Sequence, residues 1–424
     1  MTERRYDNLT QFVRQYGKPY STEYDEYEKL PYDKPVVAGK NTPIYNAHSY
    51  HTKVPYQGII PFIKHYSEPG DLILDPFCGT GMTGVAALLA PSGPRRVILN
   101  DLSPAAVHIA RNYCTPCDVD ELKKEFERIK AAVTEEFDWL YETYHEDPET
   151  GEKIPATIQY TIWSDVYQCL PKKRDIEKHH VNPGGCGREI VLWDVAVDTK
   201  SGQVKDTFTC PQCGETWKKT ELNLVRSIPV ITNYIYIDPK KKKPRRAEHR
   251  VTDFELQRLK EIEYQEIPYW YPTDAFDDTR EMWRGIHRDQ GITRACDFYT
   301  KRNLWALARL WEETNSIEDE RTAKMVRFAI TGTMQGASRM NRHKPNFTAS
   351  ILIGTLYVGS FIEEANVLRL LSPRIEKTTQ LAKTIPSEAC TSVACLHAGK
   401  LDQILADSVD YIFTDPPFGS NIFY

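Results

Sequence analysis

The stretch from Leu72 to Leu89 constrains most strongly how this chain can fold. The apolar run Leu72-Ile73-Leu74 leads into a glycine-rich turn, and the apolar residues 85–89 follow the turn. This order predicts a buried β-strand, a tight turn and an α-helix. The turn reads Asp75-Pro76-Phe77-Cys78-Gly79-Thr80-Gly81-Met82-Thr83-Gly84. Glycines let a backbone approach a ligand where a Cβ atom would collide, so the segment predicts an α/β fold that cradles a nucleotide-like ligand.

An acidic residue follows the next expected strand. Residues 97–99 are apolar, and Asp101 comes directly after them, about 20 residues beyond the turn. A carboxylate at this place can accept hydrogen bonds from both hydroxyls of a ribose. Because Gly79, Gly81 and Gly84 also satisfy the dinucleotide pattern, the turn alone leaves two cofactors open, a nicotinamide dinucleotide and S-adenosylmethionine.

A second motif lies near the end of the chain. The apolar residues 411–413 are followed by Asp415-Pro416-Pro417-Phe418. A nicotinamide enzyme has no need of this tetrapeptide. Together, the two motifs resemble those of the amino-directed DNA methyltransferases, which transfer a methyl group from S-adenosylmethionine to adenine N6 or cytosine N4. A subgroup of these enzymes carries an inserted zinc ribbon.

The resemblance implies a set of cofactor-binding residues. The backbone from Phe77 to Gly81 would surround the amino-acid part of S-adenosylmethionine, and Asp75 would interact with its amino group. Asp101 would bind the ribose, Leu102 would lie beside the adenine, and Thr52 and Lys53 are candidate contacts of the carboxylate. The expected residues are Thr52, Lys53, Asp75, Pro76, Phe77, Cys78, Gly79, Thr80, Gly81, Asp101 and Leu102.

The tetrapeptide is expected to carry the chemistry. An exocyclic amino nitrogen is a poor nucleophile because its lone pair is delocalised into the ring. Hydrogen bonds from the amino group to the Asp415 carboxylate and the Pro416 carbonyl would hold the nitrogen nearer sp³ geometry. Pro417 stiffens the turn with Pro416, and Phe418 offers a ring on which a flipped base can stack.

The target base is expected to be adenine. The acid at position 415 favours adenine N6 over cytosine N4 by resemblance, and it favours DNA over other substrates. A cytosine-C5 methylase would need a cysteine nucleophile, and the Pro116-Cys117 pair lacks that setting. Three alternatives stay open: a cytosine-N4 methyltransferase, a catalytically silent DNA-recognition or assembly subunit that retains cofactor binding, and a nicotinamide oxidoreductase.

Cysteines in the middle of the chain predict a structural zinc site. Cys210-Pro211-Gln212-Cys213-Gly214 has the spacing of a metal knuckle, and Cys186-Gly187 is typical of the second half of another. Residues 190–197 and 204–208 between them are expected to form a β-hairpin. Cys169 is the favoured fourth ligand, with His179 or His180 as a substitute and an absence of metal as the remaining alternative. The pair formed by Cys114 and Cys117 is a rival, but no glycine follows it.

The predicted architecture is a Rossmann-like class I methyltransferase sheet interrupted by a large α+β insertion. Residues 1–40 would form an N-terminal arm, 41–120 and 385–424 the S-adenosylmethionine-binding catalytic domain, and 121–384 the inserted target-recognition region, with a zinc ribbon at about 160–225. The sequence continues for only six residues beyond Phe418, and the resembled sheet has about three more strands. We therefore expect an incomplete sheet whose missing strands a protein partner supplies, as in a split or truncated enzyme.

Charge and composition fit a protein that binds DNA through local patches. The net charge is −5, which argues against bulk electrostatic wrapping of DNA. Residues 240–250 form a basic run, expected as a solvated loop or, with a DNA substrate, as a contact to phosphates. Arg339, Arg342, His343 and Lys344 form a second basic cluster. Ten cysteines without a secretory signal, and no run of 18 apolar residues, predict a cytoplasmic protein without a membrane span. The resemblance leaves the biological role open among restriction-modification, phage defence and regulation.

Overall fold

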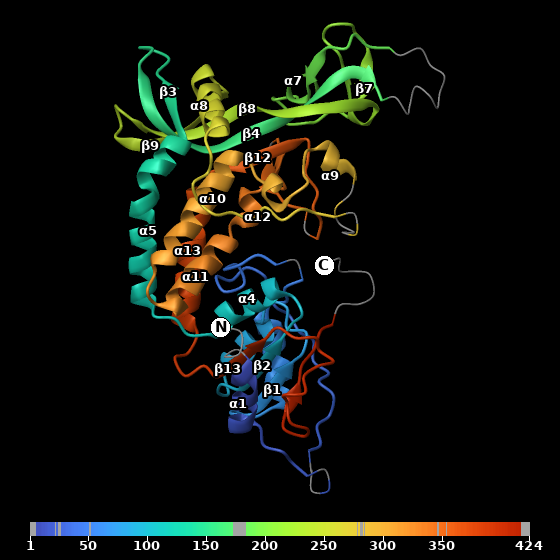
Figure 1. The fold of residues 1–424 in the computed structure, drawn as a ribbon, viewed down its shortest axis with the longest axis vertical. Coiled ribbons are helices and arrows are strands. Elements are labelled where there is room, and N and C mark those ends of the chain that lie inside the picture. Colours follow the sequence, from blue (N-terminus) through green and yellow to red (C-terminus); the bar gives the residue numbers. More distant parts are fainter. Residues whose placement is uncertain are drawn as a thin grey trace.

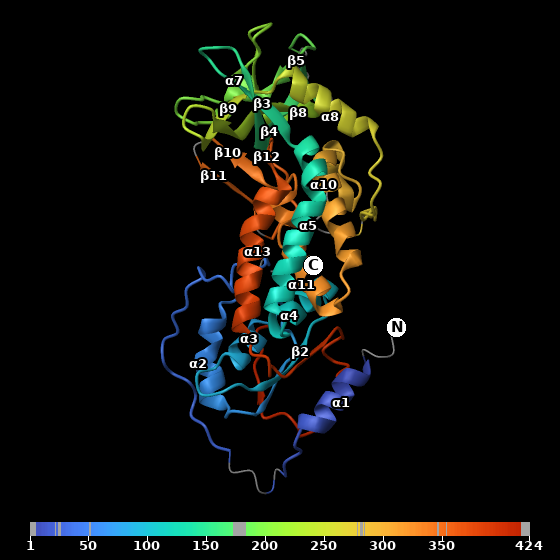
Figure 2. The same cartoon turned by 90° about the vertical axis from the view of Figure 1, so that its left-hand side faces the viewer.

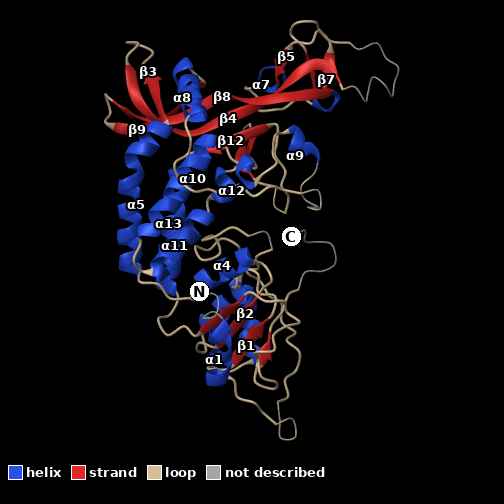
Figure 3. Cartoon of the chain, viewed as in Figure 1, coloured by secondary structure: helices blue, strands red, loops and turns tan. Residues whose placement is uncertain are grey.

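The structure is a computed structural model that describes residues 6–21, 23, 27–50, 52–172, 184–277, 279, 283, 285–345, 347–352 and 354–416. It is elongated, with a small parallel sheet at one end, a column of helices in the middle and a long antiparallel sheet at the other end (Figure 1). Figure 3 shows the same division by element type. The chain is therefore a mixed α/β protein, which confirms the predicted class at that level.

The parallel sheet has four strands in the order β13-β2-β1-β14. They are β1 (Leu72–Asp75), β2 (Arg96–Asn100), β13 (Thr391–Ala394) and β14 (Tyr411–Ile412). Leu74 is the partner of Ile98 on one side and of Ile412 on the other. Strands β1 and β2, from the first quarter of the chain, thus pair with strands β14 and β13, which lie about 300 residues later in the sequence. Because all four strands are parallel, their carboxyl ends share one edge of the sheet.

Side chains along β1 and β2 alternate between two apolar layers, as a period of two requires. Ile73, Val97 and Leu99 belong to the core that they share with helices α2 (Tyr56–Tyr66), α3 (Met82–Leu88) and α4 (Pro104–Cys114). Leu72 and Ile98 face the other way and pack with α1 (Tyr6–Tyr16). Helix α1 of the predicted N-terminal arm therefore covers one face of the sheet (Figure 2).

The column of helices joins the two sheets. It is built from α5 (Val119–Leu140), α10 (Lys301–Glu313), α11 (Glu320–Thr331), α12 (Met334–Ala337) and α13 (Val367–Thr384). Helix α11 packs against α4, so the column shares one continuous core with the parallel sheet.

The long antiparallel sheet is organised by two strands, β4 (Lys153–Pro171) and β8 (Leu222–Asp238), which pair along most of their length. The described strand order is β11-β10-β12-β4-β8-β9, and β3 and β5 also pair with β4. The other strands are β3 (Glu142–Glu146), β5 (Glu189–Val191), β9 (Lys243–Arg250), β10 (Arg342–Lys344), β11 (Phe347–Ser350) and β12 (Phe361–Ala365). The smaller elements are α7 (Leu192–Ala196), β6 (Thr207–Thr209), β7 (Thr216–Lys218), α8 (Asp253–Tyr264), α9 (Gly285–Asp289) and 3₁₀ turns at Lys219–Glu221, Ala295–Phe298 and Thr314–Ser316.

Several local predictions need correction. The expected hairpin at 190–197 and 204–208 is instead strand β5, helix α7 and a single bridge between Val197 and Val204. The basic run at 240–250, expected as a loop, is largely the exposed strand β9. No described helix is both long enough and apolar enough to cross a membrane.

Candidate functional site

Three carboxylates meet at the carboxyl edge of the parallel sheet. Asp75 ends β1, Asp101 follows β2 and Asp415 follows β14. Asp75 is buried, whereas Asp415 is exposed. Burial, with smaller contributions from the charges of Asp101 and Asp415, raises the pKa of Asp75 to about 7. The edge thus gathers acidic side chains where ligands bind in open α/β sheets.

The glycine turn is held by hydrogen bonds to the end of β2. The amide of Cys78 donates to the carbonyl of Asn100 at 2.8 Å. The amides of Gly79 and Ser103 donate to the two carboxylate oxygens of Asp101, at 2.9 and 2.8 Å. Asp101 therefore ties the turn to the start of α4, and the remaining lone pairs of its oxygens can accept further hydrogen bonds.

Two glycines of the turn adopt the left-handed backbone conformation for different reasons. At Gly81, with φ of 76°, a Cβ atom would lie 2.8 Å from the Cβ of Ala110, so the residue packs tightly against α4. At Gly79, with φ of 51°, a Cβ would meet no atom within 4 Å. The turn is therefore closed on the helix side and open at Gly79, where a ligand can approach the backbone.

Exposed apolar side chains flank this opening. Phe77 is 43% exposed and Leu102 is 68% exposed, although both are large and apolar. Pro76 is half-buried, and Cys78 and Thr80 are buried beneath the turn. Asp75 is held in place by the Thr83 hydroxyl, which donates to it at 2.5 Å, and by the Phe77 amide at 3.1 Å.

Lys53, in the segment that precedes α2, is buried, and Thr52 beside it is exposed. The ammonium of Lys53 donates to the carbonyls of Tyr45 and His48, the latter at 2.7 Å, and to the Tyr113 hydroxyl at 3.3 Å. Burial, followed by the charge of Arg374, lowers the pKa of Lys53 to about 7. The structure thus places the ammonium within the protein, and its contact with a cofactor carboxylate stays a prediction.

The tetrapeptide is described only in its first half. Asp415 and Pro416 belong to the described structure, and Pro417 and Phe418 lie outside it. The Phe413 amide donates to the Leu74 carbonyl at 3.0 Å, which sets the strand end that precedes Asp415 next to the end of β1. The roles predicted for all four residues stay predictions.

Asn100 is a site residue that sequence reasoning missed. It is fully buried at the end of β2. Its amide nitrogen donates to the carbonyls of Pro76 and Leu396, and its side-chain oxygen accepts from the Leu396 amide at 3.1 Å. Asn100 therefore joins the glycine turn to the loop after β13. The available signal was a polar residue directly after the apolar run 97–99.

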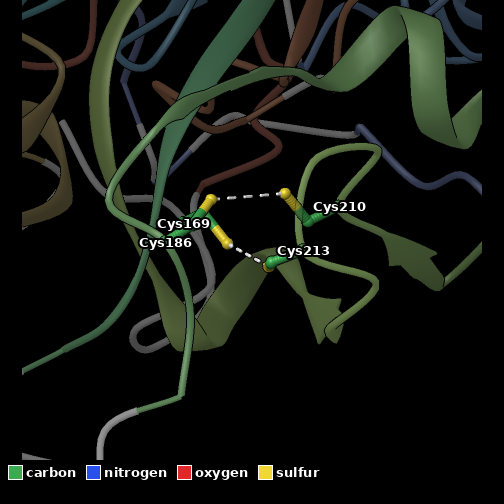
Figure 4. A group of neighbouring side chains, drawn as sticks. All are labelled: Cys169, Cys186, Cys210 and Cys213. Atoms are coloured by element: carbon green, nitrogen blue, oxygen red, sulfur yellow. Dashed lines mark hydrogen bonds between the residues drawn. The ribbon is translucent and has the colours of Figure 1, made fainter.

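Four cysteines form a second site at the far end of the long sheet (Figure 4). The sulfur atoms of Cys169, Cys186, Cys210 and Cys213 all lie within 4.8 Å of one another. Cys169 and Cys213 approach to 3.7 Å, and Cys186 and Cys210 approach to 3.8 Å. Four thiol ligands at such mutual distances suit a tetrahedral zinc ion, so the group fits this metal.

Glycines shape both knuckles of the cysteine group. Gly187 and Gly214 follow the second cysteine of each half and have φ of 74° and 79°. A Cβ at Gly185 would lie 2.2 Å from the Cys169 carbonyl oxygen, so the chain can pass Cys169 only with a glycine there. The alternative ligands His179 and His180 lie outside the described residues.

Comparison with known proteins gives one finding for the first quarter of the chain. Residues 3–112 match the family model described as DNA methylase, of the N6/N4 type. The match covers α1, the glycine turn and Asp101, and it supports the resemblance to adenine-N6 and cytosine-N4 DNA methyltransferases. It also extends the resemblance into the first 40 residues. No curated protein and no solved structure matches the chain.

Proposed function

We propose that this chain is an S-adenosylmethionine-dependent DNA methyltransferase that acts on adenine N6. One observation carries the proposal: three carboxylates and an open glycine turn share the edge of the parallel sheet, within and beside the segment that matches a DNA methylase family. The strand order β13-β2-β1-β14 supports a Rossmann-like, class I type of sheet, interrupted between β2 and β13 by the region of about 121–384.

The residues at the edge fit S-adenosylmethionine. The backbone at Gly79 is open to a ligand, the Asp101 carboxylate has acceptor capacity for ribose hydroxyls, and Leu102 offers an exposed apolar side chain to an adenine ring. When bound, the cofactor supplies an electrophilic methyl group. Asp75 through Gly81 would hold its amino-acid part, with Thr52 and Lys53 as candidate partners of the carboxylate.

Asp415 and Pro416 would position the target amino group. The Asp415 side chain is exposed and follows directly from the sheet edge, so a base can reach it. Its carboxylate and the Pro416 carbonyl are acceptors for the two amino hydrogens. These hydrogen bonds hold the nitrogen with its lone pair free of the ring, which is catalysis by positioning and electrostatics without a covalent intermediate. Pro417 and Phe418 complete the motif by resemblance.

The cysteine group would have a structural role. Four protein ligands leave zinc no open position for water, so a zinc ion at Cys169, Cys186, Cys210 and Cys213 would take no part in the reaction. It would stabilise the end of the strand pair β4–β8. The inserted region is the proposed DNA-recognition part of the chain.

The test is transfer of a tritiated methyl group to unmethylated double-stranded DNA, followed by digestion to nucleosides. The proposal expects label in N6-methyladenine, lost in Asp415→Ala while cofactor binding is kept. Label in N4-methylcytosine would move the target to cytosine. Cofactor binding without any transfer would instead identify a catalytically silent recognition subunit.

A further inference from the structure

A basic cavity lies where the cysteine-bearing end of the long sheet meets strands β10 and β12. Its volume is about 220 Å³. One wall comes from α7, β6 and the 3₁₀ turn at Lys219–Glu221, and the other comes from β10, the loop before β12 and β12 itself. We call it the junction cavity; it is lined by Leu192, Val204, Lys205, Asp206, Phe208, Lys219, Arg342, His343, Lys344, Tyr357, Gly359, Ser360 and Phe361.

The junction cavity concentrates positive charge in a protein that is acidic as a whole. Lys205, Lys219, Arg342 and Lys344 line it, and Asp206 is the acidic lining residue among the described side chains. Within the described structure, none of the four cations forms a salt bridge. Like charges that share one cavity repel each other, and an anion placed among them relieves that repulsion.

The hydrogen bonds of these cations leave donors available. Lys219 donates to the Ser360 hydroxyl at 3.2 Å, and Arg342 makes two long contacts with Ser350, at 3.2 and 3.3 Å. Lys205 and Lys344 are exposed, and in the part of the chain that the structure describes their ammonium groups have no hydrogen-bond partner. Each ammonium therefore retains donors for an anionic oxygen.

The size and wall of the cavity indicate which anion fits. A volume of about 220 Å³ is below the roughly 300–1,000 Å³ of small-molecule sites, so a phosphate group fits better than a whole nucleotide. At the rim, Tyr357 is 38% exposed, and its ring centroid lies 5.7 Å from the Arg342 guanidinium. Gly359 lets Arg342 lie along this wall, because a Cβ there would stand 3.1 Å from the Cγ of Arg342.

We infer that the junction cavity binds a backbone phosphate of duplex DNA and anchors the substrate of the proposed methyltransferase, on which this inference rests. Phosphate contacts fix the register and orientation of a protein on DNA without reading its sequence. All residues that line the cavity belong to the inserted region of about 121–384, which is the proposed DNA-recognition part of the chain.

The test is the salt dependence of binding to a short duplex of mixed sequence, measured by fluorescence anisotropy on the full chain. Each lost phosphate contact lowers the slope of log affinity against log salt by about 0.9. Lys205→Gln/Lys344→Gln, which changes two exposed side chains, is expected to weaken binding several-fold and to reduce the slope by about one or more. Arg342→Gln is expected to act in the same direction. The matched control Lys383→Gln, on the exposed surface of α13, is expected to keep the wild-type slope.

Zinc content and S-adenosylmethionine binding of each variant report whether the rest of the protein is intact. Wild-type slopes in both cavity variants would overturn the inference and leave the proposed function standing. Saturable binding of inorganic phosphate that these variants abolish, without any change in DNA binding, would identify a free-anion site and would also overturn it. If the cavity variants weaken DNA binding but the wild-type protein transfers no methyl group, the phosphate site would be supported and the proposed methyltransferase reaction would be contradicted.

Discussion

Asp75 shows how one buried carboxyl can set a pH dependence at the sheet edge. Its folded pKa of about 7 lies far above the usual value of 3.8, mainly because the side chain is buried. Folding therefore favours the protonated form. The associated stability is fully present below about pH 4 and is lost as pH rises through about 7.

Asp75→Asn is expected to remove this dependence. The Asn amide keeps an oxygen acceptor for the Phe77 amide, and the Thr83 hydroxyl can turn to accept from the new amide. Relative to wild type, the variant should gain stability between pH 4.5 and 7.5, by up to about 4 kcal/mol for a shift of three pKa units. The measurement is denaturant unfolding at both pH values. An unchanged difference between the two proteins would show that Asp75 ionises normally.

The elements around the glycine turn were predictable because each leaves a strong local signal. The apolar run ending at Asp75, the glycine turn and the strand before Asp101 all appear as expected from the sequence. The segment 190–197 did not, because a short run that is apolar except for Asp194 fits a strand and a buried helix equally well. Its residues Leu192, Trp193 and Ala196 are buried on one side of α7 against β4 and β6, a tertiary contact that no local pattern contains.

The site itself was predictable only in part. The strand-end acids follow from the motifs, since the carboxyl ends of parallel strands share an edge. The role of Asn100 depends on the Leu396 backbone, nearly 300 residues away in the sequence. The basic run at 240–250 gave a charge signal and no periodicity, so its pairing with β8 was missed. Spacing identified Cys186, Cys210 and Cys213, whereas Cys169 was the favoured candidate among several for the fourth ligand; the structure brings all four cysteines together.

Packing between α3, β2 and α4 depends on Gly84. A Cβ there would lie 2.7 Å from both the Sγ of Cys114 and the Cδ1 of Leu99. Gly84→Ala is therefore expected to lower the free energy of unfolding by about 1–3 kcal/mol, as overpacked cores do. Gly39→Ala, where a Cβ meets no atom within 4 Å, is the matched control and should be nearly neutral. Equal stability of the two variants would contradict the packing described for α3.

The cysteine group is expected to hold one zinc ion per chain. Cys213→Ser should lose the metal measured by mass spectrometry of the purified protein, and it should increase proteolysis within residues 184–221 because metal binding stabilises small ribbons. Cys395→Ser changes an exposed cysteine outside the group and should keep the zinc. Equal zinc content in Cys213→Ser and wild type would contradict the assignment of these four cysteines as zinc ligands.

At the scale of the whole molecule, a buried ion pair joins the helical column to the long sheet. Arg302 of α10 and Glu364 of β12 are almost fully buried and bonded to each other. Two residues of β4 join this pair. The Trp163 indole donates to the Glu364 carboxylate at 2.8 Å, and the Thr161 hydroxyl accepts from the Arg302 guanidinium at 2.8 Å. The two halves of the molecule are therefore held together by a polar network inside an apolar core.

Removing one member of this pair should cost much more than removing both charges. Arg302→Met leaves a buried carboxylate without its partner and is expected to destabilise the fold by about 3–5 kcal/mol. Adding Glu364→Gln removes that charge and keeps an acceptor for Trp163, so the double variant should recover part of the loss. A double-mutant cycle in denaturant measures this, and simple additivity of the two changes would refute the network.

The most direct measurement for the central claim is calorimetric binding of S-adenosylmethionine to the full chain. The account predicts saturable binding by the wild type. It also predicts at least tenfold weaker binding by Asp101→Ala, which removes the acceptor for both the glycine turn and the ribose. Asp415→Ala should bind the cofactor as wild type does. A wild-type protein that binds no S-adenosylmethionine would contradict the account, because the carboxyl edge of the sheet would then serve another ligand.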